Sequence, residues 1–132
     1  MSRLKNLSDV DFEDLCRDIA QAEYGIRFSA FGPGPDGGID GRHAKGDKKT
    51  VLQSKHYIGS SFSQLESATG REAKKLPQLK PDRYFLFTSH SLTPTRSKKL
   101  ADIIGDYLRD PGDIWGQEDI EAALRKHPAI EK

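Results

Sequence analysis

The chain has 132 residues and a formal net charge of +1, with 35% hydrophobic and 31% charged residues. This balance indicates a globular domain and excludes an intrinsically disordered chain. The lone cysteine, Cys16, excludes a disulfide framework and a multi-cysteine zinc site. No apolar run approaches the roughly 20 residues of a membrane span, and no signal peptide opens the chain, so we expect a cytoplasmic protein.

The predicted elements follow from apolar spacing and from turn residues. Ser8 and Gly25 bound a first helix whose apolar face includes Cys16, which we therefore assign to the core. Pro77 is expected to stop the second helix, and Thr93-Pro94 to start the third. The elements in order are a helix over 9–24, strands over 26–31, 39–44 and 50–57, a helix over 61–76, a strand over 84–87, a helix over 93–108, a short strand over 114–115 and a helix over 118–126.

This order predicts an α/β fold with a mixed central sheet, in one domain over residues 1–132. The chain breaks off without a clear stop, which suggests the N-terminal piece of a longer protein. The charge is also unevenly distributed: the balance is −4 over residues 1–40, +9 over 41–99 and −4 over 100–132. A basic middle permits a polyanionic partner, although an ordinary solvated surface explains much of the asymmetry.

A glycine-rich loop follows the first predicted strand. Gly32, Gly34 and Gly37 fit the dinucleotide-binding pattern G-x-G-x-x-G. That pattern requires a helix directly after the loop, whereas Pro35 and the strand-like segment after Gly38 oppose one. We therefore reject a dinucleotide site, and a nucleotide-binding module remains only a third option for the chain.

The histidines form no metal-binding spacing. They lie scattered along the chain, and no nucleophile elbow accompanies them, so we interpret each as a surface or site-rim residue. His56 and His90 stand out because they lie at predicted strand ends. The four are His43, His56, His90 and His127.

The strongest constellation combines polar side chains from three elements. Alternation along the strand over 50–57 places Gln53 and Lys55 on one face and Ser54 on the other. A lysine inside a small domain needs an acidic partner, and Asp40 on the neighbouring hairpin strand can supply it. Glu13 lies in the first helix.

These residues suit metal-assisted hydrolysis of a phosphodiester. The Asp40 carboxylate, the Gln53 side-chain oxygen and the Ser54 carbonyl offer the oxygen ligands that Mg²⁺ prefers, and Glu13 can complete the set. Lys55 would orient a water or offset charge on the phosphate. A structural Asp–Lys pair across the hairpin explains the same residues equally well.

Three short motifs resemble the PD-(D/E)xK nuclease superfamily. They are Phe12-Glu13, the run 37–41 with sequence Gly-Gly-Ile-Asp-Gly, and Gln53-x-Lys55. They are most similar to the Mrr-like restriction endonuclease branch, in which Q-x-K replaces (D/E)-x-K. The resemblance implies a restriction-endonuclease-like fold with an αβββαβ core and a magnesium-dependent DNA endonuclease, with Mn²⁺ as a substitute metal.

The same resemblance implies roles for individual residues. Asp40 corresponds to the metal-binding aspartate, Gln53 to the acidic position, Lys55 to the catalytic lysine and Glu13 to the helical glutamate of the metal site. Asp36 either binds the metal or caps the glycine loop. Because Gln53 carries no charge, metal affinity should be weaker unless Glu13 or Asp36 compensates.

A narrower resemblance concerns the runs 30–34 and 113–116. They are similar to the N-terminal nuclease domains fused to STAND-type NTPases in bacterial antiphage defence, in which the longer chain oligomerises and the nuclease degrades DNA. This resemblance implies a homo-oligomer acting on DNA, which we expect to be double-stranded.

Basic side chains in the middle segment provide candidate phosphate contacts, and no helix-turn-helix or zinc finger accompanies them, so we expect little sequence specificity. A near-neutral chain should bind DNA weakly by itself. The neutral Gln53 keeps open an alternative function, a nuclease-like fold that only binds nucleic acid or mediates oligomerisation. The candidate DNA contacts are Lys45, Lys48, Lys49, Arg71, Lys74, Lys75, Arg96, Lys98 and Lys99.

Overall fold

The computed structural model describes residues 3–25, 29–30, 41–45, 48–57 and 61–128. The helices and strands are α1 (Asp9–Tyr24), β1 (Ser29–Ala30), β2 (Gly41–Lys45), β3 (Lys48–Lys55), α2 (Phe62–Ala73), α3 (Leu76–Leu79), β4 (Arg83–Thr88), α4 (Pro94–Ile104), β5 (Ile114–Trp115) and α5 (Gln117–Lys126). Short 3-10 turns cover Arg3–Asn6, Gly105–Tyr107 and Pro111–Asp113.

The strands form one sheet in the order β1-β2-β3-β4-β5. β1, β2 and β3 pair antiparallel, with Gly41 opposite Leu52 in the β2–β3 hairpin. β3, β4 and β5 pair parallel, with Lys55 opposite Thr88. The predicted mixed sheet and its α/β class are confirmed, and the parallel part brings the carboxyl ends of β3 and β4 to one edge.

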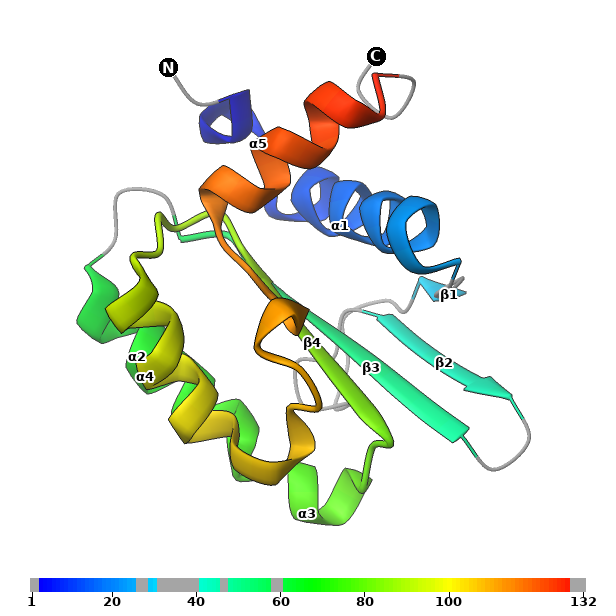
Figure 1. The fold of residues 1–132 in the computed structure, drawn as a ribbon, viewed down its shortest axis with the longest axis vertical. Coiled ribbons are helices and arrows are strands. Elements are labelled where there is room, and N and C mark those ends of the chain that lie inside the picture. Colours follow the sequence, from blue (N-terminus) through cyan, green and yellow to red (C-terminus); the bar gives the residue numbers. More distant parts are fainter. Residues whose placement is uncertain (1–2, 26–28, 31–40, 46–47, 58–60, 129–132) are drawn as a thin grey trace.

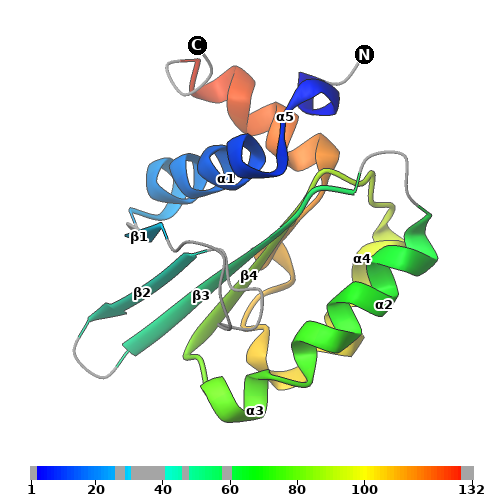
Figure 2. The same ribbon diagram turned by 180° about the vertical axis from the view of Figure 1, so that it is seen from behind.

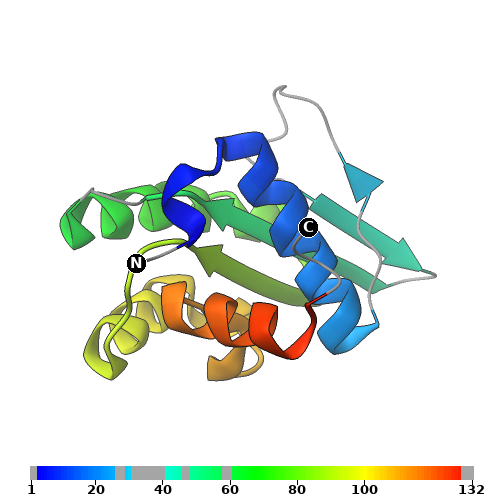
Figure 3. The same cartoon turned by 90° about the horizontal axis from the view of Figure 1, so that it is seen from above.

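Helices cover both faces of this sheet (Figures 1 and 2). α1 and α5 lie over one face, as the view in Figure 3 shows, and α2 and α4 lie side by side over the other. Alternating residues of β4 divide between the two layers: Phe85 and Phe87 pack under α1 and α5, whereas Tyr84 and Leu86 pack against α2 and α4. β4 therefore needs apolar residues on both faces, which accounts for its continuous apolar run.

The first helix has the boundaries that its sequence predicts. The Ser8 hydroxyl accepts the Asp11 N–H at 3.1 Å, and Gly25 ends the helix in the left-handed region at φ 69°. Such a cap contributes about 1 kcal/mol. Cys16 is fully buried in the core beneath α1, as expected. No helix among the described residues is long and apolar enough to cross a bilayer.

Several predicted boundaries were wrong, among them the start of β3, which begins at Lys48 and not at residue 50. α2 ends at Ala73, and Pro77 lies at the start of α3, where its missing N–H costs no helical hydrogen bond. α4 ends at Ile104 because Gly105 adopts φ 72°, and a 3-10 turn continues the chain. β3 ends at Lys55 rather than two residues later.

Candidate active site at the carboxyl ends of the parallel strands

A small pocket lies where β3 ends against the first half of α1. Its volume is about 180 Å³. We call it the strand-end pocket, and it is lined by Asp9, Phe12, Glu13, Ser54, Lys55, His56 and Tyr57. Three of the residues that the sequence singled out, Glu13, Ser54 and Lys55, therefore meet in one cavity although they come from two elements.

Lys55 forms the best-defined ion pair of the region. Its Nζ lies 3.2 Å from Oε2 of Glu72 in α2, and the other carboxylate oxygen of Glu72 lies 3.0 Å from Nζ of Lys75. The Lys55 and Glu72 side chains are 17% and 12% exposed, so the pair is mostly withdrawn from solvent. Lys55 thus belongs to the face of β3 that α2 covers, as alternation predicted.

Sequence analysis did not identify Glu72. Its spacing from the buried residues of α2 indicates that it lies beside the buried face of the helix. Glu72 follows Leu65 by seven residues, Ala68 by four and Thr69 by three. A carboxylate beside the buried stripe of a helix needs a cation. The acidic partner that we expected for Lys55 was Asp40, which lies outside the described residues.

Glu13 is the carboxylate of α1 that reaches the strand-end pocket. It is 28% exposed, and one of its oxygens lies 4.0 Å from Nη1 of Arg17, one turn along the helix. Arg17 also hydrogen-bonds Asp14 on the same helix. Part of the Glu13 charge is therefore compensated by Arg17, and a cation in the pocket would share Glu13 with it.

His56 holds the rim of the pocket to two other segments. Its ring stacks on Phe12 with centroids 4.8 Å apart. Nε2 lies 2.7 Å from the Leu7 carbonyl oxygen, and Nδ1 lies 2.8 Å from Oγ of Ser89. The same Oγ accepts the Tyr57 N–H at 2.7 Å.

These partners show which nitrogen of the ring donates to Leu7. A carbonyl oxygen only accepts, so Nε2 of His56 carries the hydrogen that Leu7 receives. Ser89 accepts from Tyr57 and can then give its own hydroxyl hydrogen to Nδ1. The network ties the ends of β3 and β4 to the segment before α1.

The remaining predicted ligands are only partly covered by the structure. Gln53 is buried, at 2% exposed, opposite Leu86 in the β3–β4 ladder, and Ser54 is 9% exposed. Asp36 and Asp40 lie outside the described residues, as does the glycine loop. Within the part of the chain that the structure describes, no three His, Cys, Asp or Glu side chains form a metal cluster.

The oxygen donors that are described suit a hard divalent cation. A Glu13 carboxylate, a Gln53 amide oxygen and a Ser54 carbonyl are the donor types that such ions prefer. No cysteine or histidine cluster competes for a softer metal among the described residues. Glu13 and Ser54 line the strand-end pocket, whereas Gln53 does not and is buried on the face of β3 that α2 covers. These donor types therefore fit a divalent metal, but only two of the three residues meet in the pocket.

The predicted basic residues divide into two groups on neighbouring helices. Arg71 and Lys74 are exposed at the end of α2, where Lys75 pairs with Glu72. At the start of α4, the Arg96 guanidinium lies 5.2 Å from the centre of the Phe62 ring of α2, and Lys99 is exposed. Lys98 in the same turn pairs with Asp102 at 3.6 Å. The side chains of Lys45, Lys48 and Lys49 lie outside the described residues.

His90 and His127 do not line the strand-end pocket. His90 contacts the Ser91 carbonyl oxygen through Nδ1, and His127 contacts Glu23 at 2.7 Å. The side-chain hydrogen bond from His127 lowers the pKa of Glu23. The side chain of His43 is not among those described.

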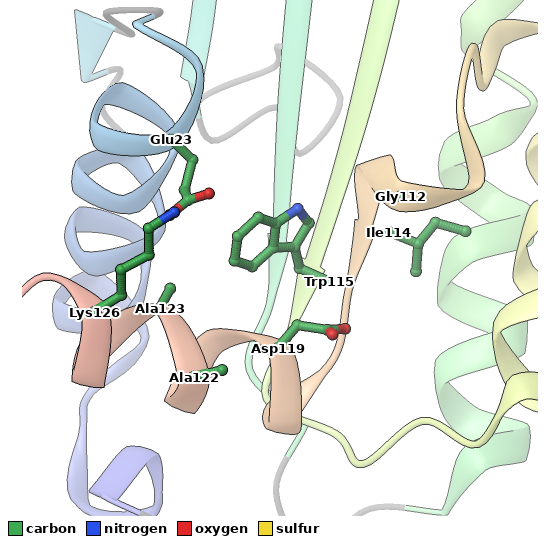
Figure 4. A pocket seen from close by; sticks show the side chains of 8 residues that line it. All are labelled: Glu23, Gly112, Ile114, Trp115, Asp119, Ala122, Ala123 and Lys126. Atoms are coloured by element: carbon green, nitrogen blue, oxygen red, sulfur yellow. The ribbon is translucent and has the colours of Figure 1, made fainter.

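A second cavity, of about 290 Å³, lies between α1, β5 and α5 (Figure 4). Trp115 forms one wall, and Lys126 reaches across to Glu23, with 3.4 Å between Nζ and Oε2. Of the residues proposed for catalysis or metal binding, none that the structure describes lines it. We therefore place the candidate site at the strand-end pocket, not at this larger cavity.

Comparison with known proteins identifies the family of the chain. Residues 4–103 match the family model of the restriction endonuclease domain, in its Mrr-type catalytic form. The chain is also 49% identical over 126 residues to an uncharacterized protein, y4cD, of Sinorhizobium fredii. That match covers 96% of this chain and 20% of the relative, so the chain spans about a fifth of the relative's length. The match over residues 4–103, with the mixed sheet and its two helical layers, shows that the chain belongs to the Mrr-like restriction endonucleases of the PD-(D/E)xK superfamily.

Proposed function

We propose that this chain is a magnesium-dependent DNA endonuclease domain that hydrolyses phosphodiester bonds at the strand-end pocket. The observation that carries the proposal is the meeting of Lys55, Ser54 and Glu13 in that pocket, in a member of a restriction endonuclease family. Nuclease activity needs a cation beside oxygen ligands at a place where a phosphate can enter. The strand-end pocket offers oxygen ligands from Glu13 and Ser54 and the cation of Lys55.

In this proposal the metal ligands are Asp40, Gln53, the Ser54 carbonyl and Glu13, with Asp36 as a further candidate. A bound Mg²⁺, or Mn²⁺ in its place, would polarise the phosphate and lower the pKa of a water. Two findings support the arrangement. Gln53 precedes Lys55 on the same face of β3, and Gly41, joined to Asp40 by one peptide bond, pairs with Leu52 beside Gln53.

Lys55 is the proposed catalytic cation. Its ammonium would orient the attacking water or offset the charge that builds on the phosphate in the transition state. Glu72 holds this ammonium at 3.2 Å and limits its freedom before substrate binds. Lys55 thus enters the reaction already placed beside the strand end.

The proposed substrate is double-stranded DNA, cut with low sequence specificity. Exposed cations on α2 and α4, among them Arg71, Lys74 and Lys99, suit phosphate contacts that position a duplex without reading its bases. Digestion of a supercoiled plasmid by the full-length protein in Mg²⁺ tests the activity. We expect nicked and linear products from the parent and none from Lys55→Ala. Equal cutting by both proteins would refute the assignment.

A second candidate function follows from the neutral Gln53. With an amide in place of a carboxylate the site loses one negative charge, which weakens its attraction for a divalent cation. The chain would then bind nucleic acid or mediate oligomerisation without cutting. DNA binding that persists in EDTA, with no cleavage in Mg²⁺ or Mn²⁺, would support this alternative. A Gln53→Glu variant that gains cleavage would show that the missing negative charge at this position prevents cleavage by the parent.

The cellular setting is also a proposal. We infer that residues 1–132 form a single nuclease domain at the N-terminus of a longer cytoplasmic protein, which assembles into a homo-oligomer and acts in bacterial antiphage defence beside a STAND-type NTPase. The greater length of the relative leaves room for such parts, and the resemblance of the sequence suggests them. Phage plating on cells that carry the full-length gene, with Lys55→Ala as the control, tests the role.

A further inference from the structure

Another polar cavity lies along α2 and shares one lining residue with the strand-end pocket. Its volume is about 500 Å³. We call it the α2 groove, and it is lined by Tyr57, Ser63, Gln64, Ser67 and Arg71. Tyr57 also lines the strand-end pocket, so one side chain borders both cavities. We propose that the α2 groove binds the sugar-phosphate backbone of DNA beside the bond to be cut, an inference that rests on the proposed nuclease function.

The lining residues form one row on the helix. Ser63, Ser67 and Arg71 follow one another at four-residue intervals, so they share a face of α2. At 1.5 Å per residue this row is about 12 Å long. That length matches about three nucleotides of a B-form strand, at 3.4 Å each. The groove therefore has the reach to contact consecutive phosphates.

The groups in the row are hydrogen-bond donors of the kind that contact phosphates. Two serine hydroxyls and a guanidinium are available to oxygen acceptors. Gln64 uses its side-chain Oε1 to accept the Ser61 N–H at 3.0 Å in the helix cap. Its amino group is the donor that remains for a ligand. The chemistry of the row thus favours an acceptor-rich ligand such as a phosphodiester.

The charge of the groove points to the same ligand. Among the described residues its lining includes the Arg71 cation and no carboxylate, and the exposed Lys74 follows Arg71 by three residues. The neighbouring Glu72 is held by Lys55 and Lys75, at 3.2 and 3.0 Å. Its negative charge is therefore largely compensated beside the groove. A polyanion is the complementary occupant.

Tyr57 gives the groove a fixed junction with the site. Its ring packs against the core beneath α2 and α4, and its backbone N–H bonds to Ser89. Tyr57 therefore lines both cavities and is held in place by packing and by this hydrogen bond. A strand that follows the groove would pass Tyr57 and reach the pocket that contains Lys55.

The test measures binding of the full-length protein to a fluorescent DNA duplex by anisotropy in EDTA, where no cleavage can occur. We expect Arg71→Ala to raise Kd by about three- to tenfold and to make the salt dependence shallower by about 0.9 in log K against log salt. Ser67→Glu should weaken binding further, since it adds a negative charge to the row. Arg125→Ala, which removes an exposed cation of α5, is the matched control and should change Kd by less than about twofold. Circular dichroism confirms that each variant is folded.

The outcomes separate the groove from the nuclease assignment. Parent-like binding by both groove variants, an equal loss in the Arg125 control, or no detectable binding by the parent would overturn the groove. If the parent cleaves plasmid and Arg71→Ala cleaves with an unchanged KM, the groove is wrong and the nuclease stands. If binding weakens as expected but the parent never cleaves, the groove stands and the nuclease assignment fails.

Discussion

The ion pair between Lys55 and Glu72 provides the sharpest test of the site's structure. The substitution is Glu72→Ala, which removes the carboxylate that holds Lys55 at 3.2 Å and Lys75 at 3.0 Å. At an effective dielectric of about 20, the attraction at 3.2 Å is about 5 kcal/mol before desolvation is subtracted. Water reaches little of the pair, because the Lys55 and Glu72 side chains are only 17% and 12% exposed.

The net loss is smaller than this attraction, since Lys55 regains some hydration once its partner is removed. We expect Glu72→Ala to lower the free energy of unfolding by about 2 kcal/mol, within the range for hydrogen bonds to charged groups. Lys75→Ala is the matched control. Lys75 is 44% exposed, so its removal should cost at most about 1 kcal/mol, as for a surface pair.

Urea denaturation followed by circular dichroism measures both changes. A double-mutant cycle with Lys55→Met and Glu72→Gln should give a coupling energy above about 1 kcal/mol, because the two side chains contact each other. Equal losses from Glu72→Ala and Lys75→Ala, or a coupling near zero, would refute a mostly buried pair. If Lys55 is the catalytic cation, Glu72→Gln should also slow plasmid cleavage.

Three further predictions concern the stability of the fold. Asp113→Asn should lower the thermal unfolding temperature and the free energy of unfolding, the latter by about 2 kcal/mol, because the buried carboxylate accepts two hydrogen bonds from Arg83, at 2.9 and 3.0 Å. A parent-like melting curve would contradict this. Gly70→Ala should stabilise α2 by about 0.5–1 kcal/mol in urea denaturation, since nothing lies within 4 Å of the added methyl group, and a loss of stability would show that the space is filled. The pKa of Glu23 is lowered by its bond to His127, so Glu23 stabilises the fold above the ordinary value of 4.5, and this contribution is lost as the pH falls through the lowered pKa. The destabilisation by Glu23→Gln should therefore shrink toward zero between about pH 6 and pH 3 in urea titrations, and a constant difference would contradict the linkage.

Local signals were sufficient where one segment determines its own structure. Ser8 and Gly25 predicted both ends of α1, because a capping hydroxyl and a left-handed glycine act on neighbouring backbone groups. Pro77 misled because proline both ends helices and begins them. The structure uses it for the second purpose, at the start of α3.

The candidate site was predictable only in part, because its contacts join distant segments. Alternation placed Lys55 correctly on its face of β3, but Glu72 lies 17 residues away on a helix. The bond from His56 to Leu7 spans 49 residues, and no local pattern encodes it. The role of Asp40 remains a prediction, since it lies outside the described residues.

The distribution of charge also has a meaning that the net value of +1 conceals. The acidic first segment contributes Glu13 to the strand-end pocket, and the basic middle contributes Lys55. Yet Lys55 and Lys75 are compensated by Glu72, so the +9 of the middle segment overstates the charge that a polyanion would meet. Each phosphate contact adds affinity that salt removes, so cations that are already paired within the protein contribute less to DNA binding at physiological salt. If the proposed nuclease binds DNA weakly in this way, several linked copies should cut DNA faster than one copy, because linked sites raise the effective concentration of DNA.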